Sequence, residues 1–268
     1  MWIKNLFGVA KPVIGMVHID ALPGTVLYNQ NSGLNRVIEH AKQDYLSLVE
    51  GGINAIIFCN ENDKPYSKEV GPHIVSSMTL IIHEVVGNKA TIPFGVDIQW
   101  DAKASLAVAS MTNASFIRGI VSGTYCGDLG FFTPDTEDIL KFRRQINADH
   151  IRILTNVNPE FSESLDRRSL ELRIMTISKS TLVDGICVSG IMAGVATSYE
   201  MLSDIKKHVG EFPIIANTGI NFDNINQALE YSDACVVATC LKVNGNSKGR
   251  IDVNNVKKLM SKLKKETK

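Results

Sequence analysis

A histidine and an acidic residue follow the first apolar run of the sequence. The run spans residues 13–17 and the chain breaks at Pro23, with His18 and Asp20 between them. An imidazole moves protons near neutral pH or binds a metal, and a nearby carboxylate can orient it. We predict His18 as an acid/base group oriented by Asp20 or Asp97, which makes three catalytic candidates. The alternative is a structural histidine hydrogen-bonded to a neighbouring strand.

Eight short apolar runs, each rich in Val and Ile, recur at nearly even spacing and have the length of buried strands. They are Pro12–Ile19, Ala55–Asn60, Pro93–Trp100, Ser115–Val121, His150–Val157, Asp184–Gly190, Pro213–Ile220 and Ala234–Leu241. Helical periodicity fills the segments between them, among them 34–52, 164–180 and about 252–265. Eight strand–helix units in about 250 residues predict an α/β fold, a (β/α)8 TIM barrel, with residues 1–268 as a single domain.

The active site of such a barrel lies where the strands end, so the polar residues at the strand ends are the candidate site residues. Asp97 and Arg118 stand near the ends of consecutive runs, and pairing them would neutralise two buried charges. We expect a mainly structural role for Asp97 and an anion-binding role for Arg118. A metal held by His18, Glu61 and Asp97 is conceivable, but ligands scattered over three runs form no recognisable motif, so no metal site is assigned and the cofactor is left unknown.

Small residues follow the last three runs, in "SGIMAG", "NTGINFDN" and "VVATCLKVNG". Such residues let backbone N–H groups approach a phosphate, although glycines also simply end strands. The predicted substrate- and phosphate-binding residues are Arg118, Ser189, Gly190, Gly194, Asn217, Gly219, Thr239 and Lys242.

The longest stretch without periodicity, Ser122–Asp135, follows the fourth run. Two interpretations stay open for it. It is either a lid over the active face or a packed surface loop held by Phe131 and Phe132.

Composition excludes several classes of protein. Lys and Arg together number 28, as do Asp and Glu, so no net charge favours nucleic acid. No run approaches the roughly 18 apolar residues of an integral membrane segment. The five cysteines form no CxxC motif, which suits reduced thiols and a cytoplasmic location.

Several stretches resemble one known family along nearly the whole chain. They are "KPVIGMVHIDALPG", "VGPHIVSSMT", "FIRGIVSGTY", "VSGIMAG", "NTGINFDN" and "TCLKVNG". The first is similar to the opening signature of the BtpA/SgcQ family, which implies a TIM barrel of the ribulose-phosphate-binding type. The family is named for an accessory role in photosystem I biogenesis, and its other namesake is associated with sugar-uptake genes. The resemblance implies no settled reaction.

The sequence departs from the family pattern at several polar positions. Cys59 stands where the family tends to have an acid, and Asp97 and Trp100 stand where it has an Asn and an Arg. Ile120 replaces an Asn, and the stretch 156–160, "NVNPE", replaces an Asp-x-His-x-Lys pattern. Asp, His and Lys can exchange protons or form a Schiff base, which Asn and Glu at these places cannot do in the same way.

Three hypotheses follow, and whether the chain is an enzyme stays open among them. The first is an enzyme that isomerises, epimerises or cleaves a small phosphorylated sugar or nucleoside-like compound. The second is a non-catalytic assembly or interaction protein, and the third is a degenerate enzyme that only binds its ligand. A homo-oligomer is compatible with each of them.

Overall fold

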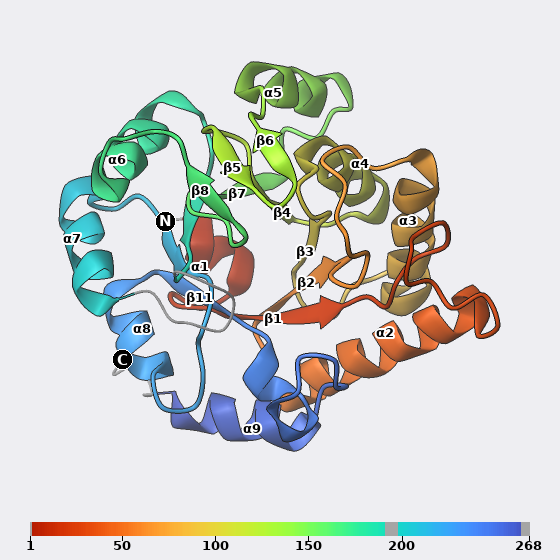
Figure 1. Cartoon of the computed structure of the whole chain (residues 1–268). Helices are drawn as coiled ribbons and strands as arrows, with labels where there is room; N and C mark the ends of the chain where they lie inside the picture. The colour runs from red at the N-terminus through yellow and green to blue at the C-terminus, as the bar shows by residue number, and fades with distance from the viewer. Residues whose placement is uncertain (1, 191–197, 264–268) are drawn as a thin grey trace.

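The computed structural model describes residues 2–190 and 198–263, and its parallel strands close into a barrel (Figure 1). The barrel strands are β1 (Val13–His18), β2 (Ala55–Cys59), β3 (Phe94–Asp97), β4 (Phe116–Gly119), β7 (Arg152–Asn156), β9 (Gly185–Val188), β10 (Ile214–Ala216) and β11 (Ala234–Val237). They follow one another around the barrel in chain order, and β11 pairs with β1 to close it. The predicted TIM barrel is confirmed, with each strand shorter than its apolar run.

One helix follows each barrel strand and packs outside the barrel, as Figure 1 shows. These helices are α2 (Gly33–Gly51), α3 (Pro72–Val86), α4 (Ala102–Thr112), α5 (Thr136–Gln145), α6 (Leu170–Ser180), α7 (Tyr199–Val209), α8 (Ile225–Tyr231) and α9 (Val253–Lys262). Asp101 and Asp135 cap α4 and α5 through hydrogen bonds from backbone N–H groups three residues later. In the described ranges, no helix has the length and apolar character needed to cross a membrane.

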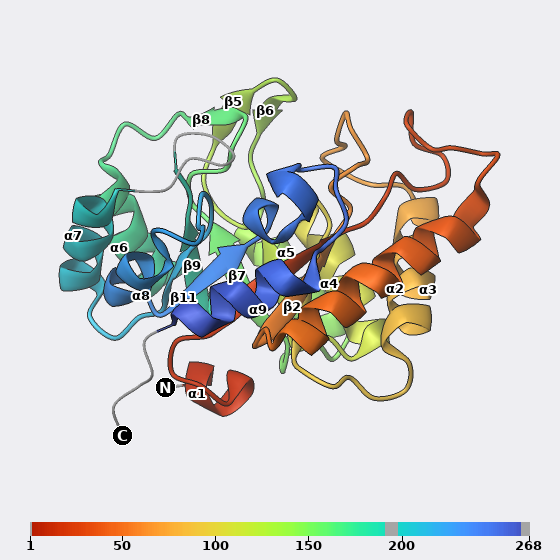
Figure 2. The same cartoon turned by 90° about the horizontal axis from the view of Figure 1, so that it is seen from below.

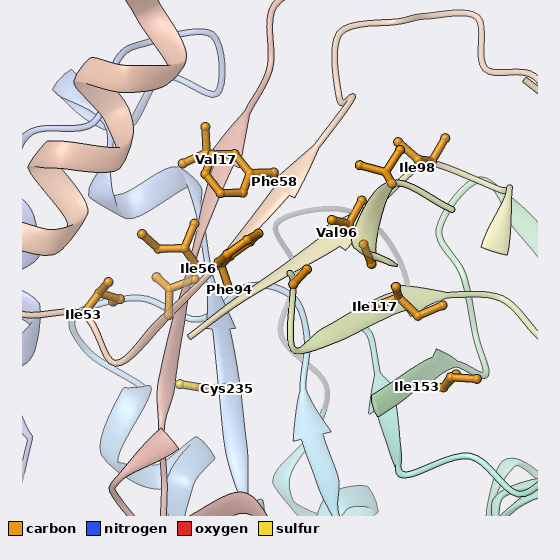
Figure 3. Packing of buried hydrophobic residues seen from close by; sticks show 14 of the residues in the cluster. Val17, Ile53, Ile56, Phe58, Phe94, Val96, Ile98, Ile117, Ile153 and Cys235 are labelled. Carbon is orange, nitrogen blue, oxygen red and sulfur yellow. The ribbon is translucent and has the colours of Figure 1, made fainter. Parts of the chain in front are cut away.

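Alternation along the strands divides the buried residues of the barrel strands between two clusters. One cluster lies between strands and helices and includes Val17, Phe58, Phe94 and Ile117. Figure 3 shows part of it, with the rings of Phe58 and Phe94 packed edge to face at 5.8 Å. The second cluster fills the barrel interior and is built from alternate strand positions such as Met16. Because successive side chains point to opposite faces, every barrel strand except β3 supplies both clusters, since the inward residues of β3 are Gly95 and Asp97.

A short helix that the sequence analysis missed, α1 (Trp2–Phe7), contributes to the interior cluster. Its Ile3 and Phe7 are buried with Met16, and the Phe7 ring packs edge to face on Phe116 at 5.6 Å. Figure 2 shows α1 at the end of the barrel away from β5, β6 and β8. The helix therefore packs against the end of the interior opposite the mouth.

The loops after β4 and β7 form a separate small sheet. Its strands are β5 (Tyr125–Gly127), β6 (Gly130–Phe132) and β8 (Ser162–Ser164), with β5 in the middle. One expectation is thereby wrong, because the helix expected from residue 164 begins at Leu170. Of the two interpretations of the loop, the packed loop held by Phe131 and Phe132 fits only in part, because Phe131 is 69% exposed.

Tyr125 anchors the small sheet instead. Its ring is buried, and its hydroxyl lies within hydrogen-bond distance of the carbonyls of Ser122 and Val157, one in each loop. Phe132 adds an edge-to-face contact with Trp100 at 5.2 Å.

We expect Phe116→Ala to lower the free energy of unfolding by about 3–5 kcal/mol, because it removes a buried ring from the centre of the barrel. Chemical denaturation measures the change. Phe131→Ala is the matched control, and we expect it to stay within about 0.5 kcal/mol of the unmodified chain because the ring is exposed. Equal stabilities for the two variants would contradict this account of the core.

Candidate functional site

The inward face of the barrel changes from apolar to polar towards the carboxyl ends of its strands. Residues two positions apart share a face of a strand. Apolar interior residues are therefore followed by polar ones, as Met16 is by His18, Phe116 by Arg118, Leu154 by Asn156 and Ile215 by Asn217. The same periodicity that fills the core thus places these side chains at the mouth.

A buried ion pair lies at the centre of this polar layer. The Arg118 guanidinium donates to the Asp97 carboxylate from Nε at 2.8 Å and Nη2 at 2.5 Å, and from Nη1 to Asn217 Oδ1 at 2.8 Å. Asn217 in turn donates to the Ser189 hydroxyl at 2.9 Å. Burial alone would lower the pKa of Arg118, but the surrounding acidic groups, of which Asp97 contributes most, together outweigh burial and raise it. Four predicted site residues therefore form one network.

His18 is the last residue of β1, and its partner is Lys242 rather than an acid. Lys242 Nζ lies 3.1 Å from His18 Nδ1 and also donates to the carbonyl of Ser247. Burial, followed by the positive charge of Lys242, lowers the pKa of His18 to about 3. Burial also lowers the pKa of Lys242, whose side chain is only 1% exposed. The pair is a neutral imidazole against a buried amine.

The predicted orienting role of the acids has no counterpart in this geometry. Asp20 accepts from Arg250 at 2.9 Å and lies 2.6 Å from His40 Nδ1. Asp97 is engaged by Arg118. The sequence analysis did not connect Lys242, which follows the last strand, with His18 on the first. Barrel closure brings them together because β11 pairs with β1.

A second polar group surrounds the end of β2. Gln99 Nε2 donates to Glu61 Oε2 at 3.1 Å and lies 3.4 Å from Cys59 Sγ. The Tyr66 hydroxyl lies 3.2 Å from the other Glu61 oxygen. Burial raises the pKa of the Cys59 thiol, which disfavours a nucleophilic thiolate. Within the described ranges, no three His, Cys, Asp or Glu side chains are arranged to hold a metal ion.

The predicted phosphate loops follow β9, β10 and β11, three neighbouring strands of the barrel. The Gly190 N–H donates to the Thr218 hydroxyl at 2.8 Å, so it is engaged in this arrangement. Gly219 has a φ of 70°, and Thr239 begins a short 3-10 helix. The backbone N–H groups of Gly219 and Thr239 have no acceptor among the residues described. Gly194 lies outside the described residues.

A pocket opens beside the ion pair, beneath the small sheet. It is lined by Asp97, Gln99, Trp100, Arg118, Gly119, Ile120, Asn156, Pro159, Glu160 and Phe161. The sequence analysis treated positions 97, 100, 120, 156 and 160 as separate departures from a family pattern, and the fold brings them to one place. Glu160 was not predicted as a site residue, because it lies in a loop and only the small sheet places it over the barrel.

Comparisons with known proteins agree with this architecture. The model of the BtpA family matches residues 9–265. The chain belongs to the BtpA family. It is 35% identical over 266 residues to the sgc region protein SgcQ of Escherichia coli (strain K12), covering 98% of this chain and 97% of SgcQ. It is 32% identical over 249 residues to the photosystem I biogenesis protein BtpA of Synechocystis sp. (strain ATCC 27184 / PCC 6803 / Kazusa), covering 92% and 85% of the two chains.

Solved structures similar to this BtpA family member include two enzymes. A thiamine phosphate pyrophosphorylase from Pyrococcus furiosus has a TM-score of 0.56 at 16% identity and covers 94% of this chain and 95% of its own. A phosphoribosyl anthranilate isomerase from Thermus thermophilus has a TM-score of 0.55 at 10% identity, covering 94% and 97%. At these identities the likeness shows the fold alone.

The buried pair predicts that a single substitution costs more stability than substitution of both partners. Arg118→Met leaves the Asp97 carboxylate buried without its partner, and we expect a loss of about 3–5 kcal/mol of unfolding free energy. Adding Asp97→Leu removes the orphaned charge and should restore part of that loss. Chemical denaturation of both variants measures the effect.

Lys257→Met, which breaks the exposed ion pair with Glu50, is the control and should cost less than about 1 kcal/mol. A double variant as unstable as the sum of its single substitutions would argue against direct coupling of Asp97 and Arg118.

The lowered pKa of His18 predicts that the folded chain becomes less stable as the pH falls. Unfolded, the imidazole takes up a proton near its ordinary pKa of 6.5, whereas the folded chain resists it down to about 3. Protonation therefore favours unfolding, and this contribution to stability is lost as the pH falls from about 6.5 towards 3. NMR of the His18 ring should show a neutral imidazole at pH 5.

Lys242→Met should raise the pKa of His18 because it removes the neighbouring positive charge. Lys248→Met, at an exposed lysine of the same segment, should leave it unchanged. An imidazole that titrates near 6.5 in the unmodified chain would contradict the burial described.

Proposed function

We propose that this chain binds a small phosphorylated compound, a sugar or nucleoside-like molecule, at the barrel mouth and moves a proton on it. The proposed reactions are isomerisation, epimerisation or lyase cleavage. The observation that carries the proposal is the His18–Lys242 pair at the seam of β1 and β11, beside the loops that follow β10 and β11. An acid/base pair next to the phosphate loops is the arrangement that such reactions need.

The phosphate end of the ligand is proposed to lie on the loops at Gly219 and Thr239. Their backbone N–H groups are unengaged within the described residues, and small residues permit a close approach. Lys242 supplies a nearby positive charge from the loop after β11, directly after the 3-10 helix Thr239–Leu241. Ser189 and Asn217 belong to the network that holds Arg118, so their proposed part is to fix the floor of the mouth.

The proton-transfer role rests on the environment of His18. A neutral imidazole at neutral pH accepts a proton at one ring nitrogen and donates from the other. Because Nδ1 faces Lys242 Nζ and accepts a hydrogen bond from it, the neutral imidazole carries its proton on Nε2, and this N–H is proposed to donate to the ligand. Asp97 is proposed to position Arg118, from which it accepts a hydrogen bond. Asp20 is proposed to position Arg250 in the same way.

Binding is tested first, by thermal shift with sugar phosphates, the same sugars without phosphate, nucleoside monophosphates and inorganic phosphate. A compound that binds the folded chain raises its Tm by mass action. We expect stabilisation only by phosphorylated compounds and its loss in Gly219→Asp, which puts a carboxylate at the phosphate position. Gly130→Asp is the control, because Gly130 also has a positive φ but lies in the small sheet.

Failure of every phosphorylated compound to raise the Tm over a wide concentration range would refute the binding proposal. Turnover is then tested with each compound that binds, by following the exchange of ligand C–H protons with D2O by NMR. His18→Gln should bind the same ligand and lose the exchange. Unchanged exchange in His18→Gln would remove His18 from the proton-transfer step.

A second candidate, a non-catalytic assembly or interaction protein, is favoured by apolar side chains exposed on the small sheet. Phe131, Phe161 and Leu165 are 69%, 52% and 48% exposed. One of the relatives is named a photosystem I biogenesis protein. This role predicts ligand-independent partner binding that Phe131→Ala weakens and Gly219→Asp leaves unchanged.

A further inference from the structure

Lys242 is a buried lysine that forms no ion pair with a carboxylate in the described part of the chain. It is 1% exposed, and its Nζ meets two neutral acceptors, the His18 ring nitrogen Nδ1 at 3.1 Å and the Ser247 carbonyl. Burial without a counter-charge favours loss of the ammonium proton. The proposed function nevertheless uses Lys242 as a positive charge that donates to His18. A negative charge elsewhere in the fold must therefore offset its burial.

The backbone around Lys242 is fastened to helix α2. Lys242 forms an antiparallel bridge with Ile251, and the Ile251 N–H donates to Asp44 Oδ1 at 2.8 Å. Asp44 lies in α2 and is 1% exposed. Figures 1 and 2 show the segment between β11 and α9, which contains this bridge, beside α2. The fold therefore brings a buried carboxylate to the bridge partner of the buried lysine.

The second oxygen of Asp44 accepts no hydrogen bond from the described residues. Oδ2 lies 3.3 Å from Arg250 Nη1, and both atoms are buried without a hydrogen-bond partner. Arg250 donates instead from Nη2 to Asp20 at 2.9 Å. One guanidinium is thus shared by two carboxylates, and with His40, the other partner of Asp20, in its neutral form this cluster has one negative charge in excess. The ammonium of Lys242 balances that charge.

Asp44 is the charged group that acts most strongly on Lys242. Burial lowers the pKa of Lys242, and Asp44 opposes burial more than any other charge does. Arg250 adds to the lowering, whereas Glu61 and Asp20 raise the pKa of Lys242 with smaller effects. In return, the charge of Lys242 favours the ionised form of Asp44 against its own burial.

The other two carboxylates have nearer cations and contact with water. Glu61 lies 3.3 Å from Lys64 Nζ, and Asp20 accepts from Arg250 at 2.9 Å. Their side chains are 24% and 32% exposed, against 1% for Asp44. Because a charge acts more strongly where water is excluded, Asp44 is the carboxylate best placed to balance the buried lysine.

We propose that Asp44 is a positioning residue of the acid/base pair, because its buried carboxylate is the counter-charge that keeps Lys242 protonated against His18. A protonated Lys242 donates to Nδ1 of His18 and leaves the imidazole proton on Nε2, the nitrogen that the proposed function directs to the ligand. This inference rests on the proposed function for its catalytic meaning. The relation between Asp44 and Lys242 itself needs no ligand.

NMR of the whole isotope-labelled chain tests this relation directly. The Lys242 Nζ signal reports whether the amine is protonated, and the ring nitrogens of His18 report which of them carries the proton. Lys242→Met and His18→Gln assign the two sets of signals. In the parent chain at neutral pH we expect a protonated Lys242 and a His18 proton on Nε2.

Asp44→Asn removes the charge and keeps an oxygen for the Ile251 N–H. We expect the pH at which Lys242 is half protonated to fall by about one unit, a tenfold weaker affinity for the proton. The His18 proton should lose its preference for Nε2 at the same lower pH, because a neutral amine accepts hydrogen bonds as well as donating them. Arg250→Gln removes the competing cation and should move the Lys242 midpoint in the opposite direction, upwards.

Asp233→Asn is the matched control. Asp233 is also buried, accepts the Ile214 N–H at 2.8 Å and pairs with Lys206 at 2.5 Å. It directly precedes β11, at the opposite end of the barrel from the mouth. Its substitution removes a buried carboxylate in the same way and should leave the signals of Lys242 and His18 unchanged.

A Lys242 midpoint that is unchanged or raised in Asp44→Asn would overturn the proposal. If Asp44→Asn does not fold, Arg250→Gln decides, because a midpoint that fails to rise there contradicts the same charge balance. Either result leaves the proposed function intact, since ligand binding is measured separately by thermal shift. If instead no phosphorylated compound binds, the proposed function fails, while a lowered midpoint in Asp44→Asn still assigns Asp44 to Lys242.

Discussion

The buried pair of Arg118 and Asp97 is the interaction on which the polar end of the barrel depends. Neither charge is stable alone in this position, because the cost of removing an ion from water is several kcal/mol. Together they are neutral, and the guanidinium has a fixed planar geometry that also reaches Asn217. Strands β3 and β4, which are already paired in the sheet, are thereby joined across the mouth to β10 by side chains.

This pairing divides the mouth into two parts with different electrostatic character. On the side of β1 and β11, a buried lysine beside a neutral histidine supplies positive charge and an exchangeable proton. On the side of β4 and β7, the charge of Arg118 is balanced by Asp97.

The sequence predicted the barrel well because hydrophobic runs at even spacing depend only on local pattern. It also predicted that His18, Arg118 and Asn217 would stand at strand ends, because period two continues from the core to the mouth. Partners were harder to predict. Which acid meets which base depends on closure of the barrel, so Lys242 replaced Asp20 beside His18. Glu160 was missed because its position depends on β8 pairing with β5, a contact between distant loops.

The small sheet has a consequence for how the mouth could evolve. Strand β5 belongs to the loop after β4 and pairs on one side with β8, from the loop after β7. A side chain at Gly127 would place its Cβ 2.1 Å from the Phe161 carbonyl oxygen, so the two loops approach without room for a larger residue. Neither loop can therefore change its length without affecting the other. An insertion or deletion in either would break the register of both, whereas the loops after β10 and β11 stand outside this sheet and are free of that restriction.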